Sequence, residues 1–207
     1  MATDRQWVIV RIDGKIAAIS TDYKALSSVA SRLAKETKPG HSKIIAETVP
    51  FETVWELRCT ARWEDFMLFG TDFQKNVWEK LYELTHSQEN LEDGKPRLLS
   101  YSDFAGLCEN RAGVRAVAHA VGLNPLAVVI PCHLVVPKES IDRISNIRKK
   151  AEDTIFKGDD LCLDKVLRDP AVDFGEYSLG RKIKRELILK ELHQPDTTGM
   201  QANHTSY

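Results

Sequence analysis

The sequence lacks long hydrophobic runs and an excess of charge of either sign. None of its apolar stretches approaches the ~20 residues that cross a bilayer, and residues 1–7 are polar and lead directly into an expected strand. We therefore expect no membrane association and a cytoplasmic or nuclear location. The 29 Lys and Arg residues nearly balance the 30 Asp and Glu residues, leaving a formal charge of −1. Because no global basic field attracts nucleic acid, any DNA binding must come from a local patch.

Zinc-type cysteine spacing is also absent. The four cysteines are far apart, and none belongs to a C-x-x-C or Cys/His pair: Cys59, Cys108, Cys132 and Cys162. We expect them to be free thiols, because a reducing compartment keeps cysteines reduced. Spacing gives no support for a structural metal, and we expect no metal site, although distant side chains can still converge.

The N-terminal third predicts a small sheet with one packed helix. Residues 7–12 and 15–20 are β-rich and flank Asp13-Gly14, a strong signal for a two-residue hairpin turn. Residues 23–35 carry apolar side chains at helical spacing, and residues 43–49 are typical of another strand. The stretch after this strand is rich in Trp and Phe and is less regular.

Two helices are expected in the middle of the chain. Thr71-Asp72 offers an N-cap for the first, whose apolar residues share one face: Phe73, Val77, Trp78, Leu81 and Leu84. Residues 87–96 are polar and are expected to form a loop. Ser100 stands three residues before Asp103, a form close to the capping box, so a short helix should run from there to about Cys108.

A third helix, from a cap at Asn110 to Gly122, has two contrasting faces. One is an apolar stripe of Val114, Val117, Ala118 and Val121. The neighbouring face, flanked by Arg115 and His119, is almost without side chains: Gly113, Ala116 and Ala120. The two successive helices form a helix-turn-helix pattern, whose second helix commonly enters DNA, and a bare face suits the narrow minor groove. Tight packing on another helix explains the small residues equally well.

The stretch after this helix carries the candidate nucleophile. Asn124-Pro125 ends the helix, because proline pushes its predecessor into an extended conformation, and residues 126–130 are expected to form a strand. Pro131-Cys132-His133 comes directly after this strand. A cysteine thiolate is a strong nucleophile that a neighbouring imidazole can generate. A buried structural cysteine is the commoner case, however, and the motif alone favours that interpretation.

The C-terminal third combines a surface excursion with a last helix. Residues 138–172 contain a basic run at 148–150 and are expected to be partly helical. Ser178 can cap a helix to about Leu192, in which Glu191 falls on the apolar stripe. A buried carboxylate is costly unless it is paired. Either the helix end frays and Glu191 reaches water, or Glu191 meets a histidine as the orienting member of a Cys/His/acid set.

Several motifs occur in sequence between residues 71 and 191: Ser100-Tyr101, Arg115-Ala116-Val117, Asn124-Pro125, Ile130-Pro131-Cys132-His133 and Tyr177-Ser178. In this order they resemble the O6-alkylguanine-DNA alkyltransferase family, also called methylated-DNA--protein-cysteine methyltransferases. The run from Arg115 to His133 is the most specific part of the resemblance, whereas the N-terminal third matches only in general architecture.

The resemblance implies an α/β (α+β) fold. A small N-terminal antiparallel sheet with a helix, of ribonuclease H-like type, precedes a mainly helical part with a helix-turn-helix of winged-helix type. We expect an N-terminal sheet-plus-helix domain at 1–68 and a DNA-binding and alkyl-acceptor domain at 69–193. The second domain contains the long excursion 138–172, and residues 194–207 are expected to form a flexible tail.

The family transfers an alkyl group from O6 of a damaged guanine in duplex DNA to a cysteine thiolate, irreversibly and without a cofactor. Carried onto this chain, the resemblance implies that Cys132 is the acceptor, His133 its base and Glu191 the partner that orients the imidazole. Because adjacent residues in an extended segment point in opposite directions, His133 would act through a bridging water. We expect a monomer whose partner is double-stranded DNA that contains O6-alkylguanine.

The resemblance also implies a set of DNA and base contacts. Extruding the nucleotide costs a few kcal/mol; Arg115 would fill the vacated place, and Tyr101 would crowd the 3′ phosphate and donate a proton to the leaving guanine. The bare helix face of Gly113, Ala116 and Ala120 would enter the minor groove. Asn124 would be the hinge between this helix and the reactive cysteine. The flipped base would be received by Val121, Asn124, the backbone of Val135, Tyr177 and Ser178.

The chain departs from the family pattern and leaves two other functions to weigh. Leu134 stands where the family usually has an arginine after Pro-Cys-His, and the excursion 138–172 is longer than usual. A non-catalytic binder of alkylated DNA is one alternative, but related binders lack the cysteine that this chain has at Cys132. A cysteine hydrolase is the other, but it would need an oxyanion hole, for which the sequence has no signature.

Overall fold

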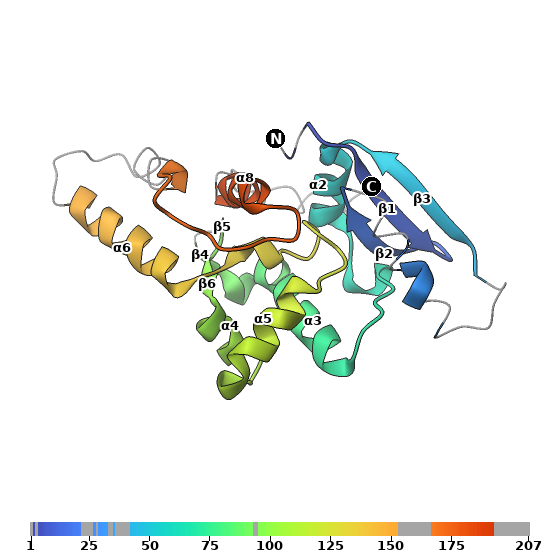
Figure 1. Ribbon diagram of the computed structural model, residues 1–207, viewed down its shortest axis with the longest axis horizontal. Coiled ribbons are helices and arrows are strands. Elements are labelled where there is room, and N and C mark those ends of the chain that lie inside the picture. The colour runs from blue at the N-terminus through green and yellow to red at the C-terminus, as the bar shows by residue number, and fades with distance from the viewer. Residues whose placement is uncertain are drawn as a thin grey trace, which may run out of the picture.

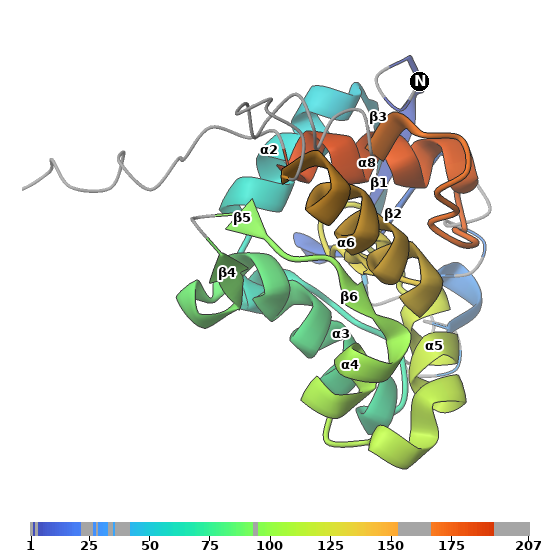
Figure 2. The ribbon, with the colours of Figure 1, turned by 90° about the vertical axis from the view of Figure 1, so that its left-hand side faces the viewer.

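The computed structural model of the chain (Figures 1 and 2) describes residues 2, 4–21, 27, 29–32, 35, 42–92, 95–152 and 167–192, and for residues 92 and 147–152 it describes the backbone alone. A small sheet stands at one end of the molecule, and helices make up the rest (Figure 1). No helix within these residues is both long enough and apolar enough to cross a membrane.

The sheet has three antiparallel strands in the order β2-β1-β3: β1 (Trp7–Ile12), β2 (Lys15–Ser20) and β3 (Ile44–Val49). Asp13 and Gly14 have φ angles of 50° and 86°, the left-handed values that a type I′ hairpin turn requires. The predicted hairpin and the third strand are confirmed.

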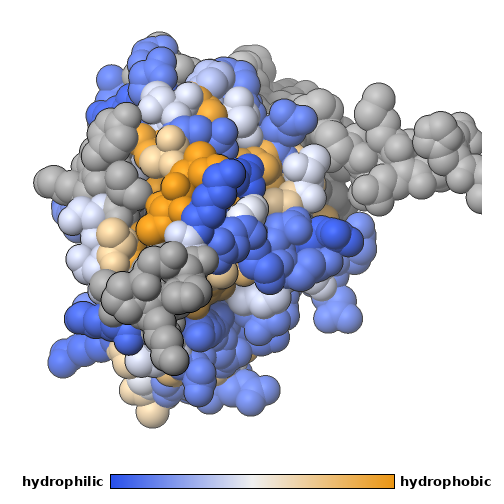
Figure 3. Space-filling view, turned by 90° about the vertical axis from the view of Figure 1, so that its right-hand side faces the viewer, coloured by the Kyte–Doolittle hydropathy of each residue, from blue (hydrophilic) through white to orange (hydrophobic). Residues whose placement is uncertain are grey.

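The predicted helix at 23–35 lies mostly outside the described residues. Among its apolar positions, Val29 is described, is buried and belongs to the cluster on one face of the sheet. The outer strand β3 leaves Ile44 and Ile45 exposed, and Figure 3 shows apolar surface at the centre of this side of the molecule.

A helix, α2 (Phe51–Thr60), occupies the stretch that the sequence led us to expect as irregular. Its buried positions are Phe51, Val54 and Arg58, which have helical spacing. The prediction was wrong because one of these three positions holds an arginine, so the apolar period is too short to recognise. A short 3-10 turn, η1 (Trp63–Asp65), comes next.

The long helix α3 (Asp72–His86) begins at the predicted cap. Gln74 N donates to Thr71 Oγ1 at 3.2 Å and Thr71 N donates to Gln74 Oε1 at 3.0 Å, forming a capping box. The predicted face is buried except for Phe73, which is 37% exposed. Trp78 Nε1 donates to the Ala120 carbonyl at 2.8 Å and so fixes α3 to the helix that contains Ala120.

The expected loop at 87–96 contains short regular pieces within its described residues. These are η2 (Gln88–Asn90), β4 (Leu91–Glu92) and β5 (Lys95–Pro96), of which β4 and β5 pair antiparallel. The loop prediction was therefore only partly correct. Downstream, β6 (Leu99–Ser100) pairs in parallel with β7 (Val135–Val136), which places the start of the helix-turn-helix beside the end of the cysteine segment.

The helix-turn-helix consists of α4 (Tyr101–Leu107) and α5 (Val114–Gly122), joined through η3 (Arg111–Gly113). Ser100 caps α4 as predicted, because its Oγ accepts from Asp103 N at 3.1 Å. The predicted cap at Asn110 is wrong, since its side chain makes no capping bond and the chain first enters a 3-10 turn. The Asn110 amide instead lies over Gly113, where a Cβ would collide with it.

Residues 126–130, which we expected to form a strand, form a compact loop. Ile130 N donates to the Leu126 carbonyl at 2.9 Å, and Val128 has a φ of 75°, a rare value for a β-branched residue. The loop packs on the N-terminal sheet, because Ile19 N donates to the Pro125 carbonyl at 2.9 Å. Polar bonds to Asn124 hold this backbone, and an apolar period cannot reveal them. The next residues form the 3-10 turn η4 (Cys132–Leu134).

One helix lies within the C-terminal excursion and another follows it. α6 (Lys138–Glu152) confirms that part of it is helical, whereas residues 153–166 lie outside the described residues. α8 (Arg181–Leu192) begins later than predicted, and Ser178 is not its cap. The reason is Gly180, whose φ of 99° interrupts the helical conformation.

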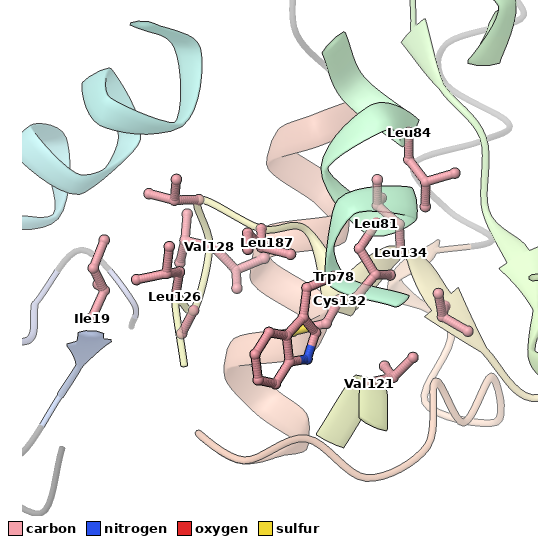
Figure 4. Close-up of a cluster of buried hydrophobic side chains, with 14 of the residues drawn as sticks. Ile19, Trp78, Leu81, Leu84, Val121, Leu126, Val128, Cys132, Leu134 and Leu187 are labelled. Carbon is pink, nitrogen blue, oxygen red and sulfur yellow. The ribbon is translucent and has the colours of Figure 1, made fainter. Parts of the chain in front are cut away.

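One hydrophobic cluster joins the sheet, the helices and residues 124–134, which comprise the compact loop and η4 and are called the cysteine loop below. Figure 4 shows Leu126 beside Ile19 at the sheet, and Cys132 beside Trp78 in the interior. Leu134 is completely buried in the same cluster. Because the loop is packed from both sides, the cysteine has a fixed position in the core. The domain boundary after residue 68 stays a prediction.

Gly113→Ala should destabilise the protein by about 1–3 kcal/mol, because the added methyl forces the Asn110 side chain away. Urea unfolding measures the free energy. Gly122→Ala is the matched control, since a Cβ there meets nothing within 4 Å. The double variant with Asn110→Ala should recover most of the loss. Equal effects at the two glycines would contradict the proposed collision.

Candidate active site

Cys132 is a buried thiol with an amide donor aimed at its sulfur. It opens η4, is 6% exposed, and its Sγ accepts from Asn124 Nδ2 at 3.0 Å. Burial raises the pKa of the Cys132 thiol, whereas the Asn124 hydrogen bond and the positive charge of Lys184 act in the opposite direction without cancelling it. The resting group is thus a thiol, and it needs a base to become a nucleophile.

The candidate base, His133, is completely buried. Its Nε2 lies 3.1 Å from Glu191 Oε1. An ionised carboxylate can only accept, so Nε2 must carry the hydrogen and Nδ1 the lone pair. Nδ1 is buried without a hydrogen-bond partner among the described residues. Burial lowers the pKa of His133, although Glu191 opposes this effect, so the imidazole is neutral and able to take a proton.

The expectation that Cys132 and His133 lie in an extended segment is wrong, because both belong to the 3-10 turn η4. No hydrogen bond joins the thiol to the imidazole within the described part of the chain. Pro131 precedes the turn and its carbonyl accepts from Leu134 N at 3.0 Å, which closes the backbone around the two residues.

Glu191 lies on the buried face of α8, as the helical period predicted, and is 2% exposed. A frayed helix end is therefore excluded. Burial alone would raise the pKa of Glu191, but the positive charge of Arg58 and the hydrogen bonds from His133 and Arg58 outweigh it and lower the pKa. The group is a buried carboxylate with two partners.

Arg58 is a site residue that the sequence reasoning missed. Its Nη2 donates to Glu191 Oε2 at 2.9 Å and its Nε donates to Glu191 Oε1 at 3.2 Å. The side chain comes from α2, whose helical period was not recognised. An arginine at a position spaced four and seven residues from the apolar neighbours Val54 and Phe51 was the available signal.

Asn124 hydrogen-bonds both ends of the compact loop at residues 126–130, which precedes the cysteine. Its Oδ1 accepts from Leu126 N at 3.0 Å, and its Nδ2 donates to the Ile130 carbonyl at 2.8 Å as well as to Cys132 Sγ. One side chain thus bonds both ends of the loop and the thiol. This agrees with a position between α5 and the cysteine, as a hinge requires.

Lys184 is the second site residue that sequence reasoning missed. It is 1% exposed, and its Nζ donates to the Val135 carbonyl at 2.8 Å and lies 5.9 Å from the centre of the Tyr101 ring. Burial lowers its pKa to about 8. It lies two helical turns before Glu191, and this spacing on the buried stripe of α8 was the available signal.

The other predicted base contacts differ in how deeply they are buried. Tyr101 is half-buried at the start of α4, and burial together with the nearby Cys132 raises its pKa. The Tyr177 hydroxyl is enclosed without a partner of hydrogen-bonding geometry among the described residues, and burial and Cys132 raise its pKa well above the usual value. Val121 is buried beside Cys132 (Figure 4), whereas Ser178 is exposed.

The second helix of the helix-turn-helix presents a mostly bare surface with positive charges. Its exposed residues, with those of η3, are Arg111, Ala112, Arg115, Ala116, His119 and Gly122. Gly113 is half-buried under Asn110. The expectation that Ala120 lies on this face is wrong, because Ala120 is 1% exposed and faces α3.

The described residues contain no group of three or more His, Cys, Asp or Glu side chains that could hold a metal ion. The candidate site contains a buried thiol, a neutral imidazole and a buried ion pair. The molecule is a helix-turn-helix protein with a buried cysteine and a buried histidine side by side in its sequence.

Comparison with known proteins identifies the family of the central segment. Residues 72–152 match the family described as 6-O-methylguanine DNA methyltransferase, DNA binding domain. This segment is therefore similar to that family, and the recognition from the sequence motifs is confirmed.

Two curated relatives give the extent of the likeness. A probable methylated-DNA--protein-cysteine methyltransferase of Acanthamoeba polyphaga mimivirus is 40% identical over 76 residues, which are 37% of this chain and 45% of that protein. The inducible methylated-DNA--protein-cysteine methyltransferase of Bacillus subtilis is 41% identical over 69 residues, or 33% of this chain and 34% of that protein. The chain thus spans less than half the length of these relatives.

A solved structure shows the fold over nearly the whole chain. The O6-methylguanine-DNA methyltransferase from the archaeon Pyrococcus kodakaraensis strain KOD1 superposes with a TM-score of 0.50 and 22% identity, covering 89% of this chain and 90% of that chain. The predicted fold class, a small antiparallel sheet followed by a mainly helical part, is confirmed.

Lys184 should make stability rise with pH between about 8 and 10.5. Its pKa is about 8 in the folded chain, against 10.5 for an unperturbed lysine, so the unfolded chain binds more protons between these values. The free energy of unfolding of wild type should gain on the order of 2–3 kcal/mol relative to Lys184→Met across this window. Urea unfolding measures it, with the exposed Lys182→Met as control. A constant difference between wild type and Lys184→Met would contradict the prediction.

Proposed function

We propose that the protein repairs O6-alkylguanine in double-stranded DNA by transferring the alkyl group to Cys132, irreversibly and once per molecule. The observation that carries the proposal is the buried thiol of Cys132, followed in the chain by a neutral His133 whose Nδ1 is buried without a hydrogen-bond partner among the described residues. The family of residues 72–152 supports it. We further propose that the chain acts as a monomer and that residues 1–68 form a domain that supports the cysteine loop.

DNA is engaged through α5 in this proposal. The exposed small residues Ala112 and Ala116 let the helix approach the floor of the minor groove closely, while Arg111 and Arg115 neutralise phosphates or enter the duplex. Arg115 fills the place that the damaged nucleotide leaves, and Tyr101 at the start of α4 crowds the 3′ phosphate. The O6 atom can be attacked only after the nucleotide has left the stack.

The flipped base is received between the cysteine loop and the segment that contains Tyr177 and Ser178. Val121, Asn124, Tyr177 and Ser178 contribute side chains, and Val135 contributes its carbonyl. A carbonyl has two lone pairs, so Val135 can accept from the guanine amino group while Lys184 holds the other lone pair.

The transfer is a displacement at the alkyl carbon. His133 Nδ1 takes the thiol proton through a water molecule, and Asn124 Nδ2 stabilises the thiolate. The sulfur forms a bond to the alkyl carbon as the carbon–O6 bond breaks. The electron pair of the carbon–O6 bond passes to the guanine. Tyr101, whose raised pKa keeps it protonated, gives a proton to the leaving guanine and regains one from His133. The thioether that remains has no good leaving group, so Cys132 is not regenerated.

Incubation with O6-benzylguanine should add one benzyl group per molecule at Cys132, because the free base reaches the pocket without DNA. Intact mass and peptide mapping measure the product, and Cys132→Ala should gain nothing. Slow turnover without an adduct would indicate a cysteine hydrolase. No reaction with retained affinity for alkylated DNA would indicate a damage-binding protein. Either result overturns the proposal.

Arg115→Ala should slow repair of alkylated duplex DNA by at least about tenfold, because an unfilled gap in the stack costs on the order of a few kcal/mol. Its reaction with free O6-benzylguanine should be unchanged, which provides the internal control. Single-turnover rates with each substrate measure the effect. Equal losses on both substrates would contradict an intercalating role for Arg115.

A further inference from the structure

The Arg58–Glu191 pair connects α2, which follows the N-terminal sheet, with α8, inside the core. Arg58 is 7% exposed and Glu191 2% exposed, and both lie outside residues 72–152. The guanidinium contacts both carboxylate oxygens, at 2.9 and 3.2 Å, in a fork that defines the orientation of the carboxylate. Figures 1 and 2 both show α2 beside α8, the two helices that carry these residues.

Glu191 Oε1 has two donors, and this is the feature that ties Arg58 to the reactive centre. Arg58 Nε donates to it at 3.2 Å and His133 Nε2 lies 3.1 Å from it. An arginine cannot give up its charge in a protein, so Glu191 stays ionised and can only accept. The hydrogen of His133 is thereby held on Nε2, and its lone pair stays on Nδ1.

The packing around Arg58 indicates that its side chain is held in place. Its guanidinium lies 6.0 Å from the centre of the Trp55 ring, and Lys190 of α8 lies 4.7 Å from the same ring, so the two helices share an aromatic contact. Leu134, next to His133, is completely buried and apolar. The residue after Pro-Cys-His therefore carries no charge, and the guanidinium that contacts Glu191 belongs to Arg58 of α2.

We propose that Arg58 is a positioning residue that fixes Glu191 as a carboxylate and so holds His133 as a neutral base for Cys132, which makes the N-terminal segment part of the reactive centre. The inference rests on the proposed function, because it assumes that Cys132 must be deprotonated. It adds a third member to the His133–Glu191 pair.

The charge balance of the cluster predicts how the site changes when Arg58 is removed. Several titratable groups from the surrounding elements interact with the imidazole or the carboxylate: Arg58 and Cys59 of α2, His86 of α3 and Lys184 of α8. Without Arg58 the buried carboxylate loses its closest cation. The charge of Glu191 then favours a protonated His133, and the pKa of His133 rises. The imidazole then holds that proton at neutral pH and cannot accept one from Cys132.

Alkylation of Cys132 as a function of pH tests this. In Arg58→Met the acid limb of the rate profile should move up by about 1–2 pH units, the size of shift that a nearby opposite charge produces. Arg58→Lys keeps the charge but loses the fork, so its acid limb should return toward wild type while its plateau rate stays lower. Arg62→Met, which removes an exposed ion pair with Glu64 on the turn after α2, should match wild type. An unmoved acid limb in Arg58→Met overturns the proposal.

Two reagents keep this result separate from the proposed function. O6-benzylguanine reports alkyl transfer, whereas iodoacetamide alkylates any accessible thiolate. If the wild type ignores O6-benzylguanine, the proposed function fails, but the iodoacetamide profiles still decide the role of Arg58.

Nitrogen-15 NMR of the wild-type imidazole covers the case in which Arg58→Met does not fold. His133 should show a protonated Nε2 and an unprotonated Nδ1 throughout the neutral pH range. A doubly protonated His133 in the wild type, or hydrogen on Nδ1, overturns the proposal without any variant.

Discussion

The buried carboxylate of Glu191 is the group on which the rest of the site depends. A charge at this depth persists only with partners, and Arg58 and His133 supply them from two other elements. The requirement joins three distant stretches of the chain: the helix after the N-terminal sheet, the turn that carries the cysteine, and the last helix. In the proposed mechanism, the contacts of Glu191 with Arg58 and His133 have two effects. They hold the three segments together, and they determine which nitrogen of His133 carries the proton.

The state of Cys132 depends on a balance between burial and local donors. Burial favours the thiol, whereas Asn124 and Lys184 favour the thiolate without reversing that preference. In the proposed function the cysteine is used only once, and this balance is then an advantage, because a protonated and buried thiol is slow to oxidise or to react with the wrong electrophile. In that proposal, activation depends on His133. Removal of Asn124 would weaken both the loop and the thiolate, since the same amide serves both.

The sequence predicted those elements whose signal is local. The Asp13-Gly14 hairpin, the Thr71 and Ser100 caps and the buried stripe of α3 depend on neighbouring residues alone, and these were correct. Glu191 was recognised because a carboxylate interrupts an apolar period. The family motifs gave the order of the site residues, and the roles assigned to those residues stay predictions.

The errors occurred where tertiary contacts decide the backbone. Residues 126–130 have the composition of a strand, but Asn124 and the edge of β2 fold them into a loop. Ala120 belongs to a face of small residues, but the Trp78 indole binds its carbonyl and buries it. Arg58 and Lys184 were missed because a charged residue on a buried face is recognised only once its partner is known.

The most direct measurement is the fate of an isotopically labelled methyl group on O6 of one guanine in duplex DNA. Incubated with excess protein, the DNA should recover an unmodified guanine at that position, and the label should appear as S-methylcysteine at Cys132, with one methyl group per molecule of reacted protein. Label released to solution, label on Cys59 or Cys108, or DNA that remains methylated would contradict the assignment of Cys132 as the acceptor.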